Sequence, residues 1–163
     1  GSYLEMLRLR GAGVGWDSVI LPGPFLPGDL RERFEREARD LGVRILDFVP
    51  STSPYIAQGE VVVCTGGYNT SAQSLRFGRK VLMIPRMMHR QEQFLRAKRL
   101  AELGLVTMLC PDEVTPQTLG DHVAAMLASP EQPLVEARAQ NRIRFDGAER
   151  IAELCAGFSV REG

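Results

Sequence analysis

Residues 65–73 combine paired glycines with polar side chains in a pattern that suits a phosphate group. The stretch Thr65-Gly-Gly-Tyr-Asn-Thr70 follows the apolar run Val61–Cys64 and leads into a segment of helical character. Adjacent glycines let the backbone approach a ligand closely, and the first turn of a helix presents unpaired N–H groups and the positive end of its dipole. This arrangement favours a phosphate or diphosphate. A tight turn with Asn69 or Thr70 as the helix cap is the alternative interpretation.

A second polar segment, Ile84–Gln93, leaves the next apolar run and enters the next helical segment. Glu92 and Gln93 offer acceptors and donors suited to vicinal hydroxyls, and Arg86 carries a charge for an anion. Strands that follow one another in sequence are neighbours about two-thirds of the time, so we expect the two segments to lie side by side. An ordinary helix start, with Glu92 favoured by the dipole and paired at i,i+4 with Arg96, is the alternative.

The elements that must position these residues alternate along the chain. Short β-branched runs are followed by charged segments of helical period, which predicts βαβ units and a parallel sheet. One helix start is marked by Thr115 and Pro116, and two helix ends by Gly42 and Gly104. A helical tail covers about 134–158, with Gly147 as a break. The sequence predicts about five strands, at 18–21, 43–48, 61–65, 81–85 and 105–109.

The sequence opens on a helical segment, Tyr3–Arg10, without a preceding strand. A parallel sheet that begins on a helix indicates that its first strand lies outside this sequence. The glycine-rich run Gly11–Gly15 offers a second phosphate loop, but it follows a helix and precedes a strand, which is the reverse of the order that cradles phosphate.

Composition excludes several function classes. The 163 residues include 20 Lys and Arg and 20 Asp and Glu, so the net charge is zero and nucleic-acid binding is disfavoured. No apolar run is long enough to span a bilayer and no export signal is visible, which makes the cytoplasm the expected location. Three widely spaced cysteines and two histidines predict free thiols and no metal site. Asp112 and Glu113 lack a matching acidic residue that would complete a metal site with them.

Together the two polar segments resemble the sugar-nucleotide motif of GT-B glycosyltransferases, and in particular the glycosyltransferase family 28 C-terminal domain. The resemblance covers about residues 46–109. It rests on the order and spacing of five motifs, which are Phe48-Val49, Thr65-Gly-Gly-Tyr-Asn-Thr70 with Gln73, Gly78-Arg-Lys-Val-Leu-Met-Ile-Pro85, Glu92-Gln93, and Arg96-Ala-Lys-Arg-Leu-Ala-Glu-Leu-Gly104. It implies a Rossmann-like three-layer α/β domain, the C-terminal half of a GT-B fold.

The resemblance also implies roles for individual residues toward a nucleotide sugar, with no metal and no other cofactor. Backbone at Val49 would read the base. The turn and helix start, Thr65, Gly66, Gly67, Tyr68, Asn69 and Thr70, would hold the diphosphate. Gln73 would face the ribose, and Glu92 and Gln93 the hydroxyls of the donor sugar. Arg86 has no settled role in the family, and no catalytic residue is expected in this chain.

Gln73 departs from the family pattern, which usually has Glu at this position. A carboxylate accepts from two hydroxyls at once, whereas an amide accepts from one and donates to another, so ribose binding is expected to be weaker. The spacing Thr70-x-x-Gln73 also fits a capping box, in which Gln73 reaches back to its own helix terminus. Both interpretations, ligand contact and cap, stay open from the sequence.

The resulting hypothesis is one domain over residues 1–163, the donor-binding part of an inverting glycosyltransferase that uses a nucleoside-diphosphate sugar, most simply a UDP-linked hexose or N-acetylhexosamine. The acceptor site and catalytic base would come from a missing N-terminal domain or a partner subunit. The chain alone would be inactive, and any peripheral membrane association would come from that other half. Two alternatives are a non-catalytic sugar-nucleotide-binding module or one subunit of a two-subunit transferase, and a UDP-sugar 2-epimerase. The scarcity of acidic and histidine residues near Gly67 disfavours the epimerase.

Overall fold

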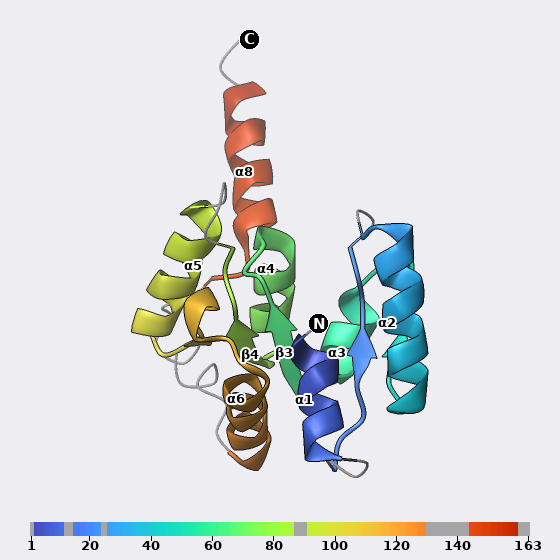
Figure 1. Ribbon diagram of the computed structural model, residues 1–163. Helices are drawn as coiled ribbons and strands as arrows, with labels where there is room; N and C mark the ends of the chain where they lie inside the picture. Colours follow the sequence, from blue (N-terminus) through green and yellow to red (C-terminus); the bar gives the residue numbers. More distant parts are fainter. Residues whose placement is uncertain (1, 12–14, 24–25, 87–90, 130–143, 160–163) are drawn as a thin grey trace.

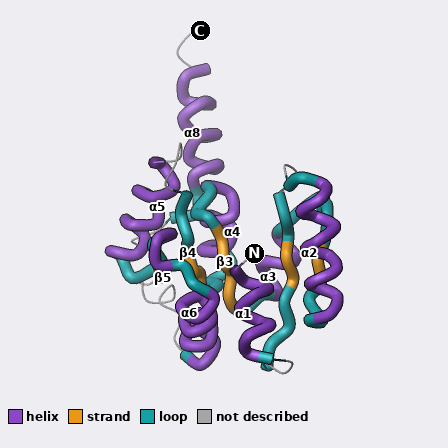
Figure 2. Tube along the Cα trace, in the orientation of Figure 1, coloured by secondary structure: helices purple, strands orange, loops and turns teal. Residues whose placement is uncertain are grey.

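The computed structural model describes residues 2–11, 15–23, 26–86, 91–129 and 144–159 (Figure 1). It confirms the predicted α/β class, with short parallel strands between helices (Figure 2). The elements, in chain order, are α1 Ser2–Arg10, β1 Val19–Ile20, α2 Gly28–Asp40, β2 Arg44–Ile45, α3 Ser53–Gln58, β3 Val61–Cys64, α4 Tyr68–Arg76, β4 Lys80–Met83, α5 Gln91–Glu102, β5 Thr107–Met108, the 3-10 helix η1 Pro111–Glu113, α6 Pro116–Ala128 and α8 Gly147–Ser159.

The five strands occur where the sequence predicts them, but they form two sheets instead of one. One sheet pairs β1 with β2, and the other has the order β3-β4-β5, with every pair parallel. In Figure 1, β1 stands apart from β3, and the N-terminus lies between them. The pairing that would join the sheets is therefore absent from the described part of the chain.

Strand β4 is the centre of the three-stranded sheet, and all four of its residues are buried. Its side chains alternate between two helical layers, as the pleat of a strand requires. Leu82 packs with Leu119 and Val123 of α6, whereas Val81 and Met83 pack with Ala97 of α5. This alternation explains the continuous apolar sequence of β4, because helices cover both faces of the strand.

Helix α1 packs against α6 and α2 on one side of the strands. Its residues Leu4, Met6 and Leu7 are buried, and the hydroxyl of Tyr3 lies 2.5 Å from that of Ser18. In Figure 1, α1 starts at the edge where the strands end and runs antiparallel to them. That is the direction of a helix following a parallel strand in a βαβ unit.

The helix boundaries predicted at Thr115, Gly42 and Gly104 are confirmed. The hydroxyl of Thr115 accepts from the Thr118 N–H at 3.0 Å, and Pro116 is the first residue of α6. Gly42 and Gly104 follow α2 and α5 with φ of 69° and 70°, the left-handed conformation expected at a helix end. In the predicted tail, α8 begins at Gly147 and projects away from the other elements (Figure 1), whereas residues 130–143 lie outside the described residues.

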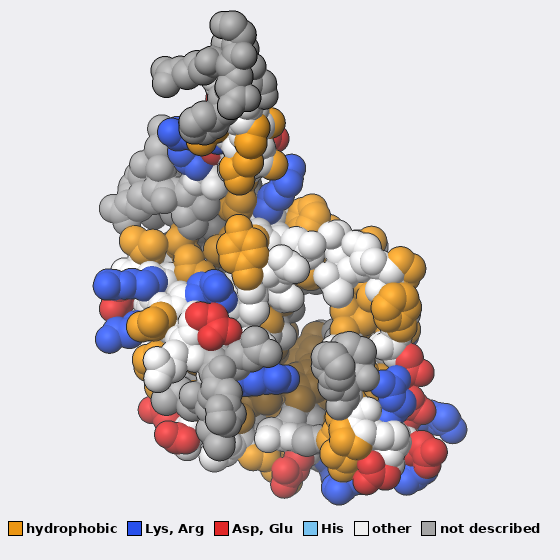
Figure 3. All heavy atoms as spheres, turned by 90° about the horizontal axis from the view of Figure 1, so that it is seen from above, with side chains coloured by type: hydrophobic (Ala, Val, Ile, Leu, Met, Phe, Trp, Pro, Cys, Tyr) orange, Lys and Arg blue, Asp and Glu red, His pale blue; other side chains and the backbone are white. Residues whose placement is uncertain are grey.

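A hollow separates the two sheets. Figure 3, which looks down on the edge where the strands end, shows it between the half built by α2 and β1 and the half built by the β3-β4-β5 sheet. Strand β3 pairs only with β4 among the described strands, and Val63 is 42% exposed. Of the helices described, none combines the length and the apolar character needed to cross a bilayer.

Candidate functional site

The turn after β3 lies against the start of α5. Gly66 is buried and has φ of 77°, and a Cβ placed on it would lie 3.4 Å from the backbone oxygen of Gln93 and 3.6 Å from Sδ of Met83. The two polar segments singled out in the sequence are therefore in contact, at the edge where the parallel strands end. This is the place where open α/β sheets bind ligands.

Arg96, one turn into α5, closes this contact. Its Nη1 donates to the Gly66 carbonyl at 2.7 Å, and its guanidinium carbon lies 5.6 Å from the centre of the Tyr68 ring. The sequence places Arg96 four residues after Glu92, which suggests a helix-surface pair and gives no signal of a bond to the turn. Sequence reasoning therefore missed Arg96 as a residue of this site.

Helix α4 starts without a side-chain cap. Its N-cap residue is Gly67, which has no side chain to accept from the first-turn N–H groups, so the interpretation that Asn69 or Thr70 caps the helix is wrong. Tyr68 and Asn69 are exposed and Thr70 is half-buried, one residue before the buried Ser71. The N–H groups of this first turn, with the positive end of the helix dipole, are suited to an anion.

Gln73 lies in the second turn of α4 and bonds outside its own helix. Its Oε1 accepts from the hydroxyl of Thr52 at 3.1 Å. The capping-box interpretation is therefore wrong, because Gly67 is the cap and Gln73 instead ties α4 to Thr52, the N-cap residue of α3. Val49 is half-buried in the same loop before α3, three residues ahead of Thr52. The loop that carries Val49, the predicted base-binding residue, is thus tied through Thr52 to Gln73, the predicted ribose-binding residue.

The start of α5 holds the predicted sugar-binding pair. Glu92 is exposed in the first turn. Gln93 is half-buried, and its Oε1 is shielded from solvent and accepts no hydrogen bond from the residues described. A shielded amide oxygen without a donor costs about 1–3 kcal/mol.

The remaining predicted site residues flank this contact. Thr65 is exposed between β3 and the turn, and Arg86 is exposed directly after the buried Pro85. Residues 87–90, which include His89, lie outside the described residues. Cys64 precedes the turn, and burial raises the pKa of its thiol, so the thiol is protonated at neutral pH. Among the residues described, no three His, Cys, Asp or Glu side chains gather into a metal-binding group.

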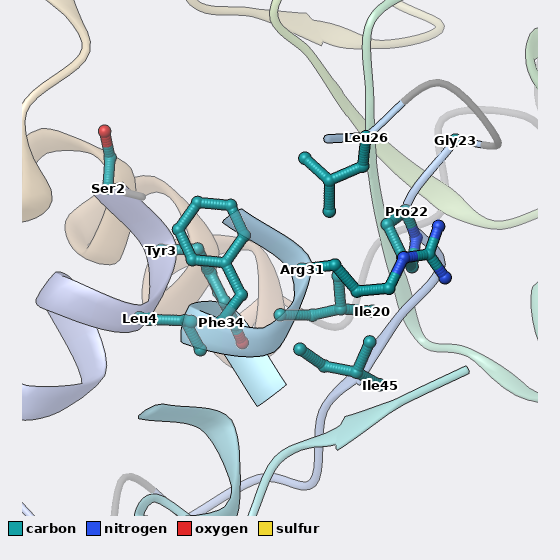
Figure 4. A pocket seen from close by; sticks show the side chains of 10 residues that line it. All are labelled: Ser2, Tyr3, Leu4, Ile20, Pro22, Gly23, Leu26, Arg31, Phe34 and Ile45. Atoms are coloured by element: carbon teal, nitrogen blue, oxygen red, sulfur yellow. The ribbon is translucent and has the colours of Figure 1, made fainter. Parts of the chain in front are cut away.

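A cavity of about 320 Å³ lies in the other half of the molecule, and none of its lining residues comes from the two polar segments. Figure 4 shows its walls, in which Tyr3 and Leu4 of α1, Phe34 of α2 and the strand residues Ile20 and Ile45 surround the space. The lining is mostly hydrophobic, and Arg31 forms an ion pair with Asp47 at its rim. We place the polar chemistry at the turn and α5, since the cavity offers few hydrogen-bonding groups.

Replacement of Gly66 should destabilise the fold. Gly66→Ala would put a Cβ on a residue with φ of 77° and bring it 3.4 Å from the Gln93 oxygen. The left-handed conformation alone costs an L-residue about 1–2 kcal/mol, and we expect the free energy of unfolding to fall by that amount. Urea denaturation measures it. Gly104→Ala is the matched control. Gly104 also has a positive φ, but no atom lies within 4 Å of its Cβ, so this variant measures the cost of the left-handed conformation without the contact to Gln93. An unchanged unfolding free energy in Gly66→Ala would contradict the described turn.

Comparison of this sequence with known protein families finds one that matches most of the chain. Residues 27–153 match the family described as "Glycosyltransferase family 28 C-terminal domain". Curated relatives include a UDP-N-acetylglucosamine–N-acetylmuramyl-(pentapeptide) pyrophosphoryl-undecaprenol N-acetylglucosamine transferase of Rubrobacter xylanophilus, 31% identical over 74% of this chain and 36% of that protein. The corresponding enzyme of Rhodopseudomonas palustris is 31% identical over 61% of this chain and 28% of that protein. The chain thus spans about a third of the length of these relatives.

Solved structures share the fold. The glycosyltransferase VinC, determined in complex with dTDP, has a TM-score of 0.65 at 21% identity and covers 95% of this chain and 36% of its own. The MurG protein of Acinetobacter baumannii has a TM-score of 0.63 at 14% identity, with 93% of this chain and 52% of its own covered. At these identities the likeness is one of fold.

Proposed function

The chain belongs to glycosyltransferase family 28, as its C-terminal domain, and on that premise we propose that it binds the nucleoside-diphosphate sugar that donates the glycosyl group. The observation that carries the proposal is the contact between the turn at Gly66 and the start of α5 at Gln93. It brings the first-turn N–H groups of α4 and the polar side chains at the start of α5 to the same edge of the strands.

Each part of the donor has a matching group. The diphosphate would meet the backbone from Thr65 to Thr70, where charge-assisted hydrogen bonds to N–H groups are strong. Because the Oε1 of Gln73 is occupied by Thr52, its amide N–H groups would donate to the ribose oxygens. Backbone at Val49 would read the base. Glu92 and Gln93 would hold the sugar hydroxyls, with Arg86 nearby as a cation.

The names of the relatives support a proposal for the donor. Curated relatives are named for UDP-N-acetylglucosamine, and VinC was solved with dTDP. We therefore propose a uridine or thymidine diphosphate sugar, most simply UDP-linked hexose or N-acetylhexosamine, with no metal ion required. Backbone donors and the α4 dipole would offset the charge of the departing diphosphate.

In the complete enzyme, an acceptor hydroxyl would lose its proton to a base and attack the anomeric carbon from the face opposite the diphosphate. A new C–O bond forms as the bond to the diphosphate oxygen breaks, which inverts the anomeric carbon. The described residues contribute orientation of the donor and stabilisation of the leaving group. We propose that the base and the acceptor site belong to an N-terminal domain or a partner subunit, so that this chain alone is inactive.

The gap between the two sheets supports a further strand in the complete domain. Strands β1 and β3 are parallel members of separate sheets, and the N-terminus of α1 lies between them (Figure 1). A strand joined by a short loop to α1 would end at the same edge as β1 and β3 and run parallel to both. Its side chains would reach the hollow of Figure 3 and the apolar cavity of Figure 4. Rapid hydrogen exchange of those β3 amides that do not bond to β4, in a chain extended before Ser2, would contradict this proposal.

Titration calorimetry tests the binding proposal directly. UDP, dTDP and GDP are titrated into the protein with and without EDTA, and circular dichroism verifies the fold. We expect weak binding of UDP or dTDP in preference to GDP, with equal affinity in EDTA because no metal contributes. A folded protein that binds none of the three nucleotides would overturn the donor-site assignment.

A further inference from the structure

Arg96 contacts the residues on both sides of Gly67. It donates to the carbonyl of Gly66 at 2.7 Å, and its guanidinium lies over the ring of Tyr68, 5.6 Å from the ring centre. Tyr68 is 70% exposed, so packing from its other side is limited, and the guanidinium is a substantial contact for this ring. One side chain of α5 therefore bridges the turn that starts α4.

The bond to Gly66 fixes the orientation of one peptide group. In a trans peptide the carbonyl and the following N–H point in opposite directions. Because the Gly66 carbonyl points to Arg96, the N–H of Gly67 must point away from Arg96. The bond from Arg96 therefore fixes the direction of the Gly67 N–H, which immediately precedes the first turn of α4.

We infer that Arg96 is a positioning residue of the donor site, which orients the Gly66–Gly67 peptide so that its N–H joins the first-turn N–H groups of α4 in facing the diphosphate. The inference rests on the proposed function. Without the hydrogen bond from Arg96, the paired glycines would leave this peptide freer to rotate, since glycine imposes little restriction on φ and ψ. The planar guanidinium suits the task because it can donate in its plane while its face lies over an aromatic ring.

Two variants separate positioning from simple charge attraction. Arg96→Lys keeps the charge and loses the planar fork, and Arg96→Gln loses both. Arg99→Gln is the matched control on the same helix, because Arg99 lies about one turn beyond Arg96 and its guanidinium pairs with Glu102 at 3.0 Å. Each protein is titrated with UDP and with uridine, and the Gly67 amide is followed by NMR without ligand.

We expect both Arg96 variants to bind UDP about fivefold more weakly, to bind uridine with unchanged affinity, and to shift the ligand-free Gly67 amide resonance, while Arg99→Gln resembles the wild type. Lysine can still donate to the Gly66 carbonyl, so the Gly67 resonance decides: wild-type affinity in Arg96→Lys together with a shifted Gly67 amide would mean charge attraction alone and would overturn the inference. Equal losses for UDP and uridine would indicate a merely structural role and would overturn it too. Failure of the wild type to bind UDP would instead overturn the proposed function, before any substitution is considered.

Discussion

Gly67→Ser is expected to weaken UDP binding by about 10- to 100-fold while leaving the fold at least as stable. Gly67 is the N-cap of α4, with φ of −59° and ψ of 146°, and a Cβ on it would meet no atom within 4 Å. Nothing in the protein's own packing therefore requires glycine at this position. A serine hydroxyl at an N-cap accepts from the N–H of the second or third helical residue, which we assign to the diphosphate.

Gly67→Ser is expected to lower the affinity for UDP without lowering the stability of the fold. Loss of structure could therefore not explain the weaker binding. A hydrogen bond to a charged group contributes about 1.5–3 kcal/mol, and its loss gives the expected fall in affinity. Serine is preferred over glycine at an N-cap by only a few tenths of a kcal/mol, so the free energy of unfolding should be unchanged or slightly higher. Calorimetry with UDP and urea denaturation measure the two quantities.

Gly67→Ala is the control for the added carbon atom. It introduces the same Cβ without a hydroxyl, so the difference between Gly67→Ala and Gly67→Ser isolates occupation of the helical N–H groups. If Gly67→Ser bound UDP as tightly as the wild type, the start of α4 would not be the diphosphate site.

How much the sequence predicts depends on the range of the interaction. Strand β4 is predictable because its apolar run records burial on both faces, and the paired glycines record a turn. The split into two sheets is not predictable in the same way, because pairing between β1 and β3 depends on what lies between them. The continuous apolar sequence of β3 predicts a strand that is buried on both faces, yet its residue Val63 is 42% exposed.

The same limit explains the residues that sequence reasoning missed. Helical spacing relates Arg96 to Glu92 but says nothing of the Gly66 carbonyl, 30 residues earlier. The bond from Thr52 to Gln73 spans 21 residues and has no local signature. Lys80 reads as the polar edge of a strand, yet it is buried, and its Nζ donates to Glu60 at 3.0 Å and to the Met126 carbonyl at 2.8 Å. Such partners are set by the topology of the fold. The hydrophobic period and the secondary-structure propensity of the sequence do not reveal them.

Gln73→Glu is expected to tighten UDP binding by about tenfold. Gln73 accepts a hydrogen bond from the Thr52 hydroxyl through its Oε1, and a carboxylate oxygen accepts that bond equally well. The tie between α3 and α4 should therefore survive the substitution. The second carboxylate oxygen would then face the ribose as an acceptor for its hydroxyls, and charge-assisted hydrogen bonds are about twice as strong as neutral ones.

The measurement compares UDP with 2′,3′-dideoxy-UDP, which lacks both ribose hydroxyls. The gain in Gln73→Glu should be confined to UDP, because the new acceptor has no partner in the dideoxy compound. Repulsion between the carboxylate and the diphosphate would weaken both ligands and so has a different signature. Thr52→Val serves as the companion variant, since it removes the hydroxyl that holds Oε1 while conserving side-chain volume. If Gln73→Glu gains no affinity for UDP while remaining folded, Gln73 is only the structural tie between α3 and α4, and the ribose lies elsewhere.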